Sequence, residues 1–253
     1  MTFKPIVAAA VLSLALAGAA HAQTAATPAS VAAHYATLVH ANYSDTLTAA
    51  RAMQNAIKAF TAAPSQANLD AARKAWLDAR EFYGQTEAFR FYGGPIDDDN
   101  GPEGQLNAWP MDESYVDYID GKKTAGLVNN RKQPITKKAL AAQNEKGGEE
   151  NVATGWHAIE FLLWGQDLSE TGHLSFEDFV HGNSHNADRR RKYLNVVTEL
   201  LIDDLNGLVK AWAPGAKNNY RATFEKGGNE SLRKMFVAMG SLSRGELAGE
   251  RLE

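Results

Sequence analysis

The residues that could do chemistry are concentrated in one short apolar run, Gly155 to Trp164, which carries a histidine and a carboxylate in its middle. Apolar residues recur there at helical spacing, which predicts a helix, and Gly155 either starts it or admits another segment to its backbone. His157 and Glu160, at i and i+3, would then be neighbours on one face. Because a buried charge requires partners, the pair forms either an internal hydrogen bond or part of a metal site.

A metal site built on this pair needs further ligands from elsewhere in the chain. Imidazole suits iron, zinc and copper, and carboxylate oxygen suits harder ions, so iron fits a site with one imidazole and several oxygens. The zincin pattern His-Glu-x-x-His is absent, and His-x-x-Glu reverses the order found in di-iron bundles. We therefore expect iron or another divalent metal, with zinc as the alternative. The candidate ligands are His157, Glu160, Glu87, Asp112, Glu113 and Glu150.

A second constellation lies on a helix predicted over residues 65–91. Five side chains fall on one face at i, i+4, i+7, i+11 and i+14: Trp76, Arg80, Tyr83, Glu87 and Arg90. Interleaved aromatic and charged groups form either a solvated face, with ion pairs of a few tenths of a kcal/mol each, or the lining of a groove. In a groove, Arg80, Tyr83 and Arg90 would surround the metal or hold an anionic iron chelate.

A long irregular segment over residues 92–122 holds further candidates. Loops of this length inside a compact domain are usually functional or disordered, and this one has apolar material with which to pack. We count Trp109 in this loop among the ligand-binding residues. Three later histidines, His173, His181 and His185, could chelate a metal, although histidines in loops are mostly solvated.

Composition excludes several classes of protein. The chain has 253 residues, of which 44% are hydrophobic and 22% charged, values that are ordinary for a soluble globular protein. The net charge of -4 implies no general affinity for nucleic acid or anionic membranes. The sequence contains no cysteine, which excludes a disulfide, a thiolate metal site and a lipid anchor on cysteine.

The N-terminus has the pattern of a secretory signal peptide. Lys4 precedes a short apolar core, and Ala20-His21-Ala22 is a small-x-small cleavage site, so we expect a signal peptide over residues 1–22. The mature chain, residues 23–253, would be exported. A bacterial periplasm is the natural destination, with association with the outer membrane as a further possibility.

The remaining pattern predicts an all-α fold of long antiparallel helices in bundle packing, because no convincing strand alternation occurs. Since the chain stops within the last predicted helix without a cap, we expect it to lack a C-terminal part. Besides the helix over 65–91, we expect helices over residues 30–62, 135–143, 155–164, 186–212 and from 229 onward.

Three motifs carry a resemblance to a known family. Gly155-x-His157-x-x-Glu160 resembles the Gly-x-His-x-x-Glu motif of the imelysin-like family. The stretch from Gly94-Pro95-Ile96-Asp97 through Leu106-Asn107-Ala108-Trp109-Pro110 to Asp112-Glu113 is similar to its iron-regulated protein A branch. The segment from Ser241 to Arg251 is similar to that branch as well.

The resemblance implies two helical-bundle halves, the second incomplete here, with a site in the cleft between them near the His-x-x-Glu helix. Family members are exported, and some are linked to iron acquisition while others are classed as metallopeptidases. The first hypothesis is therefore an exported metal-binding protein that receives a metal ion or iron chelate and passes it to an uptake partner in the cell envelope. The alternatives are a zinc-dependent metallopeptidase and a non-enzymatic module that binds a peptide or small ligand without metal.

Overall fold

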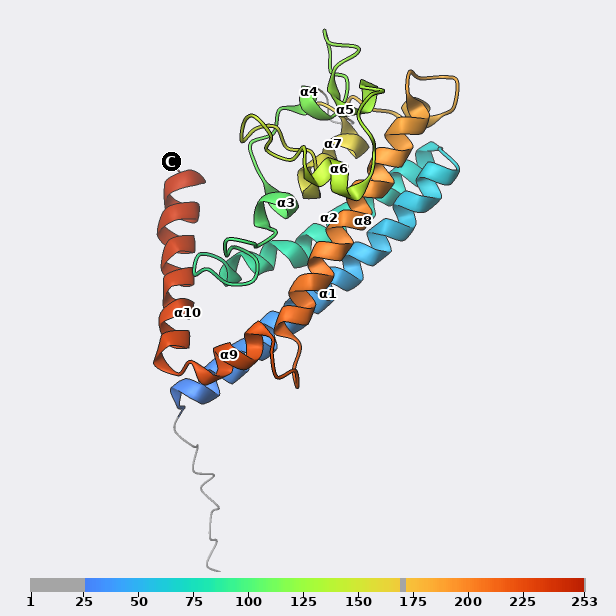
Figure 1. Ribbon diagram of the computed structural model, residues 1–253. Helices are drawn as coiled ribbons and strands as arrows, with labels where there is room; N and C mark the ends of the chain where they lie inside the picture. Colours follow the sequence, from blue (N-terminus) through green and yellow to red (C-terminus); the bar gives the residue numbers. More distant parts are fainter. Residues whose placement is uncertain (1–25, 169–171, 253) are drawn as a thin grey trace, which may run out of the picture.

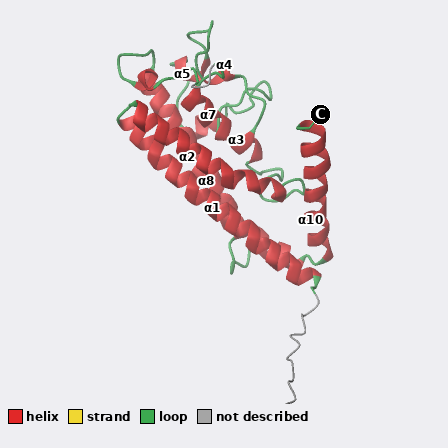
Figure 2. Cartoon of the chain, turned by 180° about the vertical axis from the view of Figure 1, so that it is seen from behind, coloured by secondary structure: helices red, strands yellow, loops and turns green. Residues whose placement is uncertain are grey.

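The computed structural model describes residues 26–168 and 172–252, which are built from helices and loops (Figures 1 and 2). In this part of the chain the one β feature is an isolated bridge between Ile119 and Lys122. The all-α prediction is confirmed. The elements are α1 (Pro28–Ala62), α2 (Gln66–Gly84), η1 (Gln85–Phe89), α3 (Glu103–Asn107), α4 (Glu113–Val116), α5 (Gly126–Asn129), α6 (Lys137–Ala141), α7 (Gly155–Trp164), η2 (Phe176–Phe179), α8 (Ala187–Trp212), α9 (Tyr220–Lys226), α10 (Asn229–Ser241) and η3 (Leu242–Glu250).

Three long helices form the framework. Helix α1 packs along both α2 and α8, and α1 and α8 lie side by side as the blue and orange diagonals of Figure 1. Thr27 and Ser30 form a capping box that starts α1. Ser65 caps α2 after a three-residue connection, so α1 and α2 form an antiparallel hairpin. The framework leaves a surface on α2 and α8 for the central apolar helix.

Helix α7 has the bounds that the sequence predicts, and it packs against α2, α8 and α3. Trp156 is fully buried, and its carbonyl accepts a 3.1 Å hydrogen bond from the indole of Trp76. Both roles considered for Gly155 are observed. It starts the helix with φ at +81°, and a β-carbon there would overlap the carbonyl oxygen of Leu106 at the end of α3.

The second predicted helix is wrong in its last seven residues, 85–91. The α-helix ends at Gly84, a poor helix former, and the chain continues as the 3-10 helix η1 to Phe89. Thr86 donates a 2.7 Å hydrogen bond to the carbonyl of Tyr83, which closes this tighter turn. Arg90 is extended, so it leaves the face that carries Trp76 and Tyr83.

Two smaller expectations about helix bounds also need correction. The helix expected over residues 135–143 is confined to α6, because Thr136 caps it at one end and the chain turns after Ala141. Glu150, a candidate ligand, lies outside the central helix, because α7 begins five residues after it.

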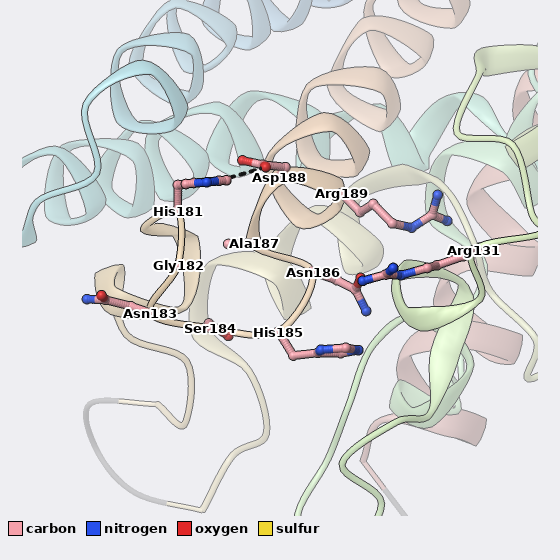
Figure 3. Close-up of a pocket in the computed structure, with 10 residues that line it drawn as sticks. All are labelled: Arg131, His181, Gly182, Asn183, Ser184, His185, Asn186, Ala187, Asp188 and Arg189. Atoms are coloured by element: carbon pink, nitrogen blue, oxygen red, sulfur yellow. Dashed lines mark hydrogen bonds and ion pairs between the residues drawn. The ribbon is translucent and has the colours of Figure 1, made fainter.

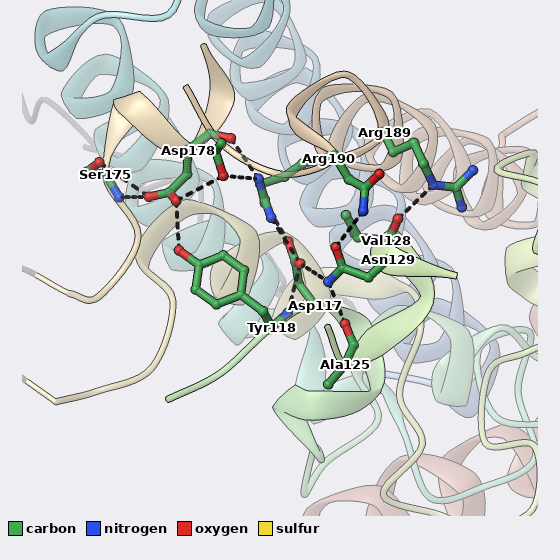
Figure 4. A network of polar contacts seen from close by, with 11 residues as sticks. Asp117, Tyr118, Ala125, Val128, Asn129, Ser175, Asp178, Arg189 and Arg190 are labelled. Carbon is green, nitrogen blue, oxygen red and sulfur yellow. Dashed lines mark hydrogen bonds and ion pairs between the residues drawn. The ribbon is translucent and has the colours of Figure 1, made fainter. Parts of the chain in front are cut away.

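A buried polar network ties the loops above the framework to α8 (Figure 4). Asp117 and Arg190 have no exposed surface, and the guanidinium binds both carboxylate oxygens, at 2.5 and 3.1 Å. Asn129 donates to Asp117 at 3.0 Å, and Arg190 donates to the carbonyl of Asp178 at 2.7 Å. Each charge has its partners, so the network holds the loops in place.

The C-terminal segment stands apart from the framework in both ribbon views (Figures 1 and 2). Helix α10 contacts α1 and η1 and continues as the π-helix η3, which has no buried residue. The side chains of Phe236 and Met239 are exposed. The predicted signal peptide lies outside the described residues, and none of the described helices has the length and apolarity needed to span a membrane.

Candidate functional site

The central pair is a hydrogen-bonded histidine and glutamate on α7. The Nδ1 atom of His157 lies 3.0 Å from Oε2 of Glu160, so the two side chains are neighbours, as the helical spacing predicts. The His157 side chain is 16% exposed and that of Glu160 is 42% exposed. In the neutral imidazole, Nδ1 donates its proton to the carboxylate, and Nε2 then keeps a lone pair that can bind a ligand.

The pair lines a cavity of about 490 Å³, which we call the aromatic cavity. The Trp109 ring lies 4.7 Å from that of His157, and the Trp109 side chain is 69% exposed at the rim. Glu113 and Asp167 add carboxylates, so the cavity combines apolar walls with acidic groups. Its other lining residues are Trp76, Leu77, Met111, Phe161, Trp164, Gly165, Gln166 and Gly172.

His157 and Trp109 also line a second cavity of about 320 Å³, which we call the arginine cavity. Arg80 donates a 2.8 Å hydrogen bond to the side-chain oxygen of Asn107, and its guanidinium lies 5.3–5.7 Å from the rings of Trp76, Tyr83 and Trp156. Burial lowers the pKa of Arg80 and raises that of Tyr83. The remaining lining residues are Gly84, Glu87 and Arg251.

The other predicted metal ligands do not lie together at one site. Glu113 shares the aromatic cavity with His157, whereas Glu87 lies in the arginine cavity, where Arg251 binds both its oxygens at 2.5 and 3.0 Å. Asp112 is exposed and caps α4, and Glu150 is exposed as well; neither lines the two cavities. Within residues 26–168 and 172–252, no three His, Cys, Asp or Glu side chains gather closely enough to hold a metal.

Arg90, predicted to bind a chelate, is engaged elsewhere. Its guanidinium forms a 2.9 Å ion pair with Glu103, and both side chains are largely buried. Burial raises the pKa of Glu103, and the charge of Arg90 opposes that rise. Arg90 lines neither cavity. Its position favours a role in holding η1 against α3.

Two polar residues that line the arginine cavity were missed by sequence reasoning as individual candidates. Asn107 and Arg251 both lie in motifs that carry the family resemblance, which is the signal that could have singled them out. The arginine cavity thus joins α2 to all three motifs: His157 from one, Asn107 and Trp109 from the second, and Arg251 from the third.

A third hollow, of about 720 Å³, opens at the start of α8 (Figure 3). It contains His181 and His185, but the cations around it are already engaged. Arg189 donates to four backbone carbonyls, two in α5 and two in the loop that follows it, and Arg131 binds the side-chain oxygen of Asn186 at 3.4 Å. Its histidines are not joined by a third ligand into a metal site in the described chain.

By its structure this is an all-α protein whose histidine–carboxylate pair lies where two cavities meet. Sequence comparison identifies the family. The imelysin family matches residues 39–253, and the chain belongs to that family. Iron-regulated protein A of Synechococcus elongatus is 34% identical to it over 136 residues, which cover 53% of this chain and 31% of that protein.

A solved structure supports the fold. It is described as an iron-regulated protein A precursor from Parabacteroides distasonis, and it is similar to this chain with a TM-score of 0.58 and 22% sequence identity. The match covers 85% of this chain and 56% of the other. The chain therefore spans about half the length of the solved relative, and the alignment with the Synechococcus protein covers about a third of that protein's length.

Proposed function

We propose that this protein binds iron, or another divalent metal, outside the cytoplasm and serves iron acquisition. The main support for the proposal is the hydrogen bond between Nδ1 of His157 and the carboxylate of Glu160. His157 lines both cavities. Metal-binding histidines almost always donate their second nitrogen to a carboxylate or carbonyl, which orients the ring and raises its basicity. The name of the Synechococcus relative, iron-regulated protein A, agrees with an iron-related role.

The donor set favours a chelated metal over a bare ion. His157 supplies one nitrogen, and Glu160 and Glu113 offer oxygens at the same cavity. Because the described residues contain no cluster of three ligands, we expect water or a chelator to complete the coordination. Iron suits such a set because it accepts one imidazole together with several oxygens.

The same donor count ranks metal binding above hydrolysis. A catalytic zinc site requires three protein ligands and an open position for water, and the described residues assemble fewer. The aromatic cavity favours a second candidate, a binding module for a small apolar ligand, since pockets of about 300–1,000 Å³ with aromatic walls are typical of such sites. Export by the signal peptide and delivery to an uptake partner in the cell envelope complete the proposal.

The test compares two histidines that share the same chemistry. Iron and zinc titrations of the apo protein, with elemental analysis, are made on wild type, His157→Ala and His181→Ala. We expect stoichiometric iron binding that is lost in His157→Ala and retained in His181→Ala. Equal binding by wild type and His157→Ala would contradict the proposal. Peptide cleavage that is lost on chelation and restored by zinc would support the peptidase instead.

A further inference from the structure

Arg80 is a partly enclosed cation beside the central pair with few hydrogen-bond partners. Within the described part of the chain it forms no ion pair, and it donates a hydrogen bond to the neutral side chain of Asn107. Arg73, seven residues earlier on α2, donates instead to the carbonyls of Leu163 and Leu174 at 2.9 and 3.0 Å. Since enclosed charges are normally paired, Arg80 has the capacity to bind an anion.

The surroundings of Arg80 point to the same chemistry. Two guanidinium groups line the arginine cavity. Arg251 is paired with Glu87 and lies 3.6 Å from Glu246, so Arg80 is the cation of this cavity that has no ion pair in the described part of the chain. The hydroxyl of Tyr83, which lines this cavity, is buried and has no hydrogen-bond partner among the described residues. A buried hydroxyl of this kind normally has a partner, either protein, water or ligand.

His157 separates two cavities of opposite character. The aromatic cavity carries the carboxylates of Glu113, Glu160 and Asp167, which would repel an anion. The arginine cavity, on the other side, attracts one. A ligand with a metal centre and a negatively charged end would therefore be oriented in a single way, with its metal at His157 and its anionic end toward Arg80.

We infer that the arginine cavity is a carboxylate subsite, so that iron is bound as a small polycarboxylate chelate. A guanidinium matches the two oxygens of a carboxylate. The chelator's oxygens would also supply the hard ligands that the described residues do not assemble around His157. The metal part of this inference rests on the proposed function. Binding of the anion at Arg80 does not depend on it.

The experiment follows quenching of tryptophan fluorescence on titration of the full chain with ferric citrate, citrate alone and iron in a neutral hydroxamate chelate. The variants are Arg80→Gln, Arg80→Lys, His157→Ala and, as the matched control on the same helix, Arg73→Gln. We expect Arg80→Gln to weaken ferric citrate binding by roughly tenfold to a hundredfold, as for loss of a hydrogen bond to a charged group. Arg80→Lys should weaken it less, and Arg73→Gln should not weaken it.

The arms separate the two proposals. Loss of citrate binding in Arg80→Gln, with no dependence on iron or His157, would support the carboxylate subsite and overturn metal binding. Ferric citrate affinity in a folded Arg80→Gln equal to that of wild type would overturn the subsite. Folding is checked by circular dichroism. Equal loss of ferric citrate and iron hydroxamate binding in Arg80→Gln would also overturn the subsite, because the hydroxamate carries no carboxylate.

Discussion

Two histidine–carboxylate pairs in this protein have the same chemistry and opposite settings. His157 and Glu160 lie 3.0 Å apart on a helix packed in the core, whereas His181 and Asp188 lie 2.8 Å apart in a loop and the first turn of α8. The side chains of His157 and Glu160 are 16% and 42% exposed, while those of His181 and Asp188 are 80% and 58% exposed, so the difference lies mainly in the histidines. The comparison teaches that enclosure, and not the pair itself, distinguishes a candidate site from a surface contact.

The physical reason lies in the solvent. An exposed pair competes with water and contributes little, and Asp188 also binds Arg191. An enclosed pair has fewer competing partners, so its geometry is retained and its free nitrogen faces a defined space. Each prediction below changes one enclosed group and one exposed counterpart, from the largest expected effect to the smallest.

The largest effect is expected at the fully buried pair of Asp117 and Arg190. Asp117→Ala leaves a guanidinium buried without its partner and should lower the free energy of unfolding by about 3–5 kcal/mol. Asp203→Ala removes the exposed partner of Lys137 and should cost less than about 1 kcal/mol. Urea unfolding followed by circular dichroism measures both. Equal costs for the two variants would break the comparison.

The next effect concerns the start of the site helix. Gly155→Ala introduces a β-carbon at positive φ against the Leu106 carbonyl, which should destabilise the fold by about 2–3 kcal/mol. Gly207 is the matched control, because it lies in α8 with open space around it, so Gly207→Ala should be neutral or stabilising by up to about 1 kcal/mol. Thermal melting of both variants tests this. If Gly155→Ala melts no lower than wild type, the close approach of α3 to α7 is wrong.

The orienting carboxylate provides the third test. Glu160→Gln keeps the size of the side chain but removes its charge, and metal affinity should fall by about 10-fold to 100-fold, as when a carboxylate behind a metal-binding histidine is changed. Asp188→Asn makes the corresponding change at the exposed pair and should leave metal affinity unchanged. Titration of both variants with iron makes the measurement. A similar affinity loss in both would mean that enclosure is not what matters.

The smallest effect is a pH dependence at two adjacent aspartates. Burial raises the pKa of Asp204 to about 6, although it accepts a 2.7 Å hydrogen bond from Gln105, whose carbonyl binds Thr154 before α7. A raised carboxyl pKa means that the folded state binds more protons than the unfolded chain between about pH 4 and 6. Stability therefore falls as pH rises through this range and does not recover above it.

Asp204→Asn should remove that slope and be more stable than wild type at pH 7.5 by about 1 kcal/mol, a value reduced because the group is partly exposed. Asp203→Asn, at the exposed neighbour, should keep the slope. Unfolding at pH 4.5 and 7.5 distinguishes the two. A wild-type protein whose stability does not fall over this range would show that Asp204 titrates normally.

Much of the fold is predictable from local pattern, and the failures have local causes as well. Helix α7 follows from apolar periodicity, and α8 was placed within a residue of its observed start. The predicted end of the helix over residues 65–91 was wrong because the apolar periodicity continues past Gly84. The poor helix propensity of Gly84 and the Thr86 hydrogen bond favour a tighter turn there. That change removed Arg90 from the face it was expected to share with Tyr83.

The sequence by itself determined that His157 and Glu160 are neighbours, because i and i+3 on a helix are adjacent whatever surrounds them. It also determined the all-α class and the motifs of the imelysin family. Only the tertiary structure decided that Asn107 and Arg251 meet His157 at one cavity, and that Asp112 and Glu150 do not. The physical reason is that periodicity encodes contacts within one element. Which loops and distant helices meet depends on packing over the whole chain, here on the approach of α3 to Gly155 and of Arg251 to Glu87 in η1.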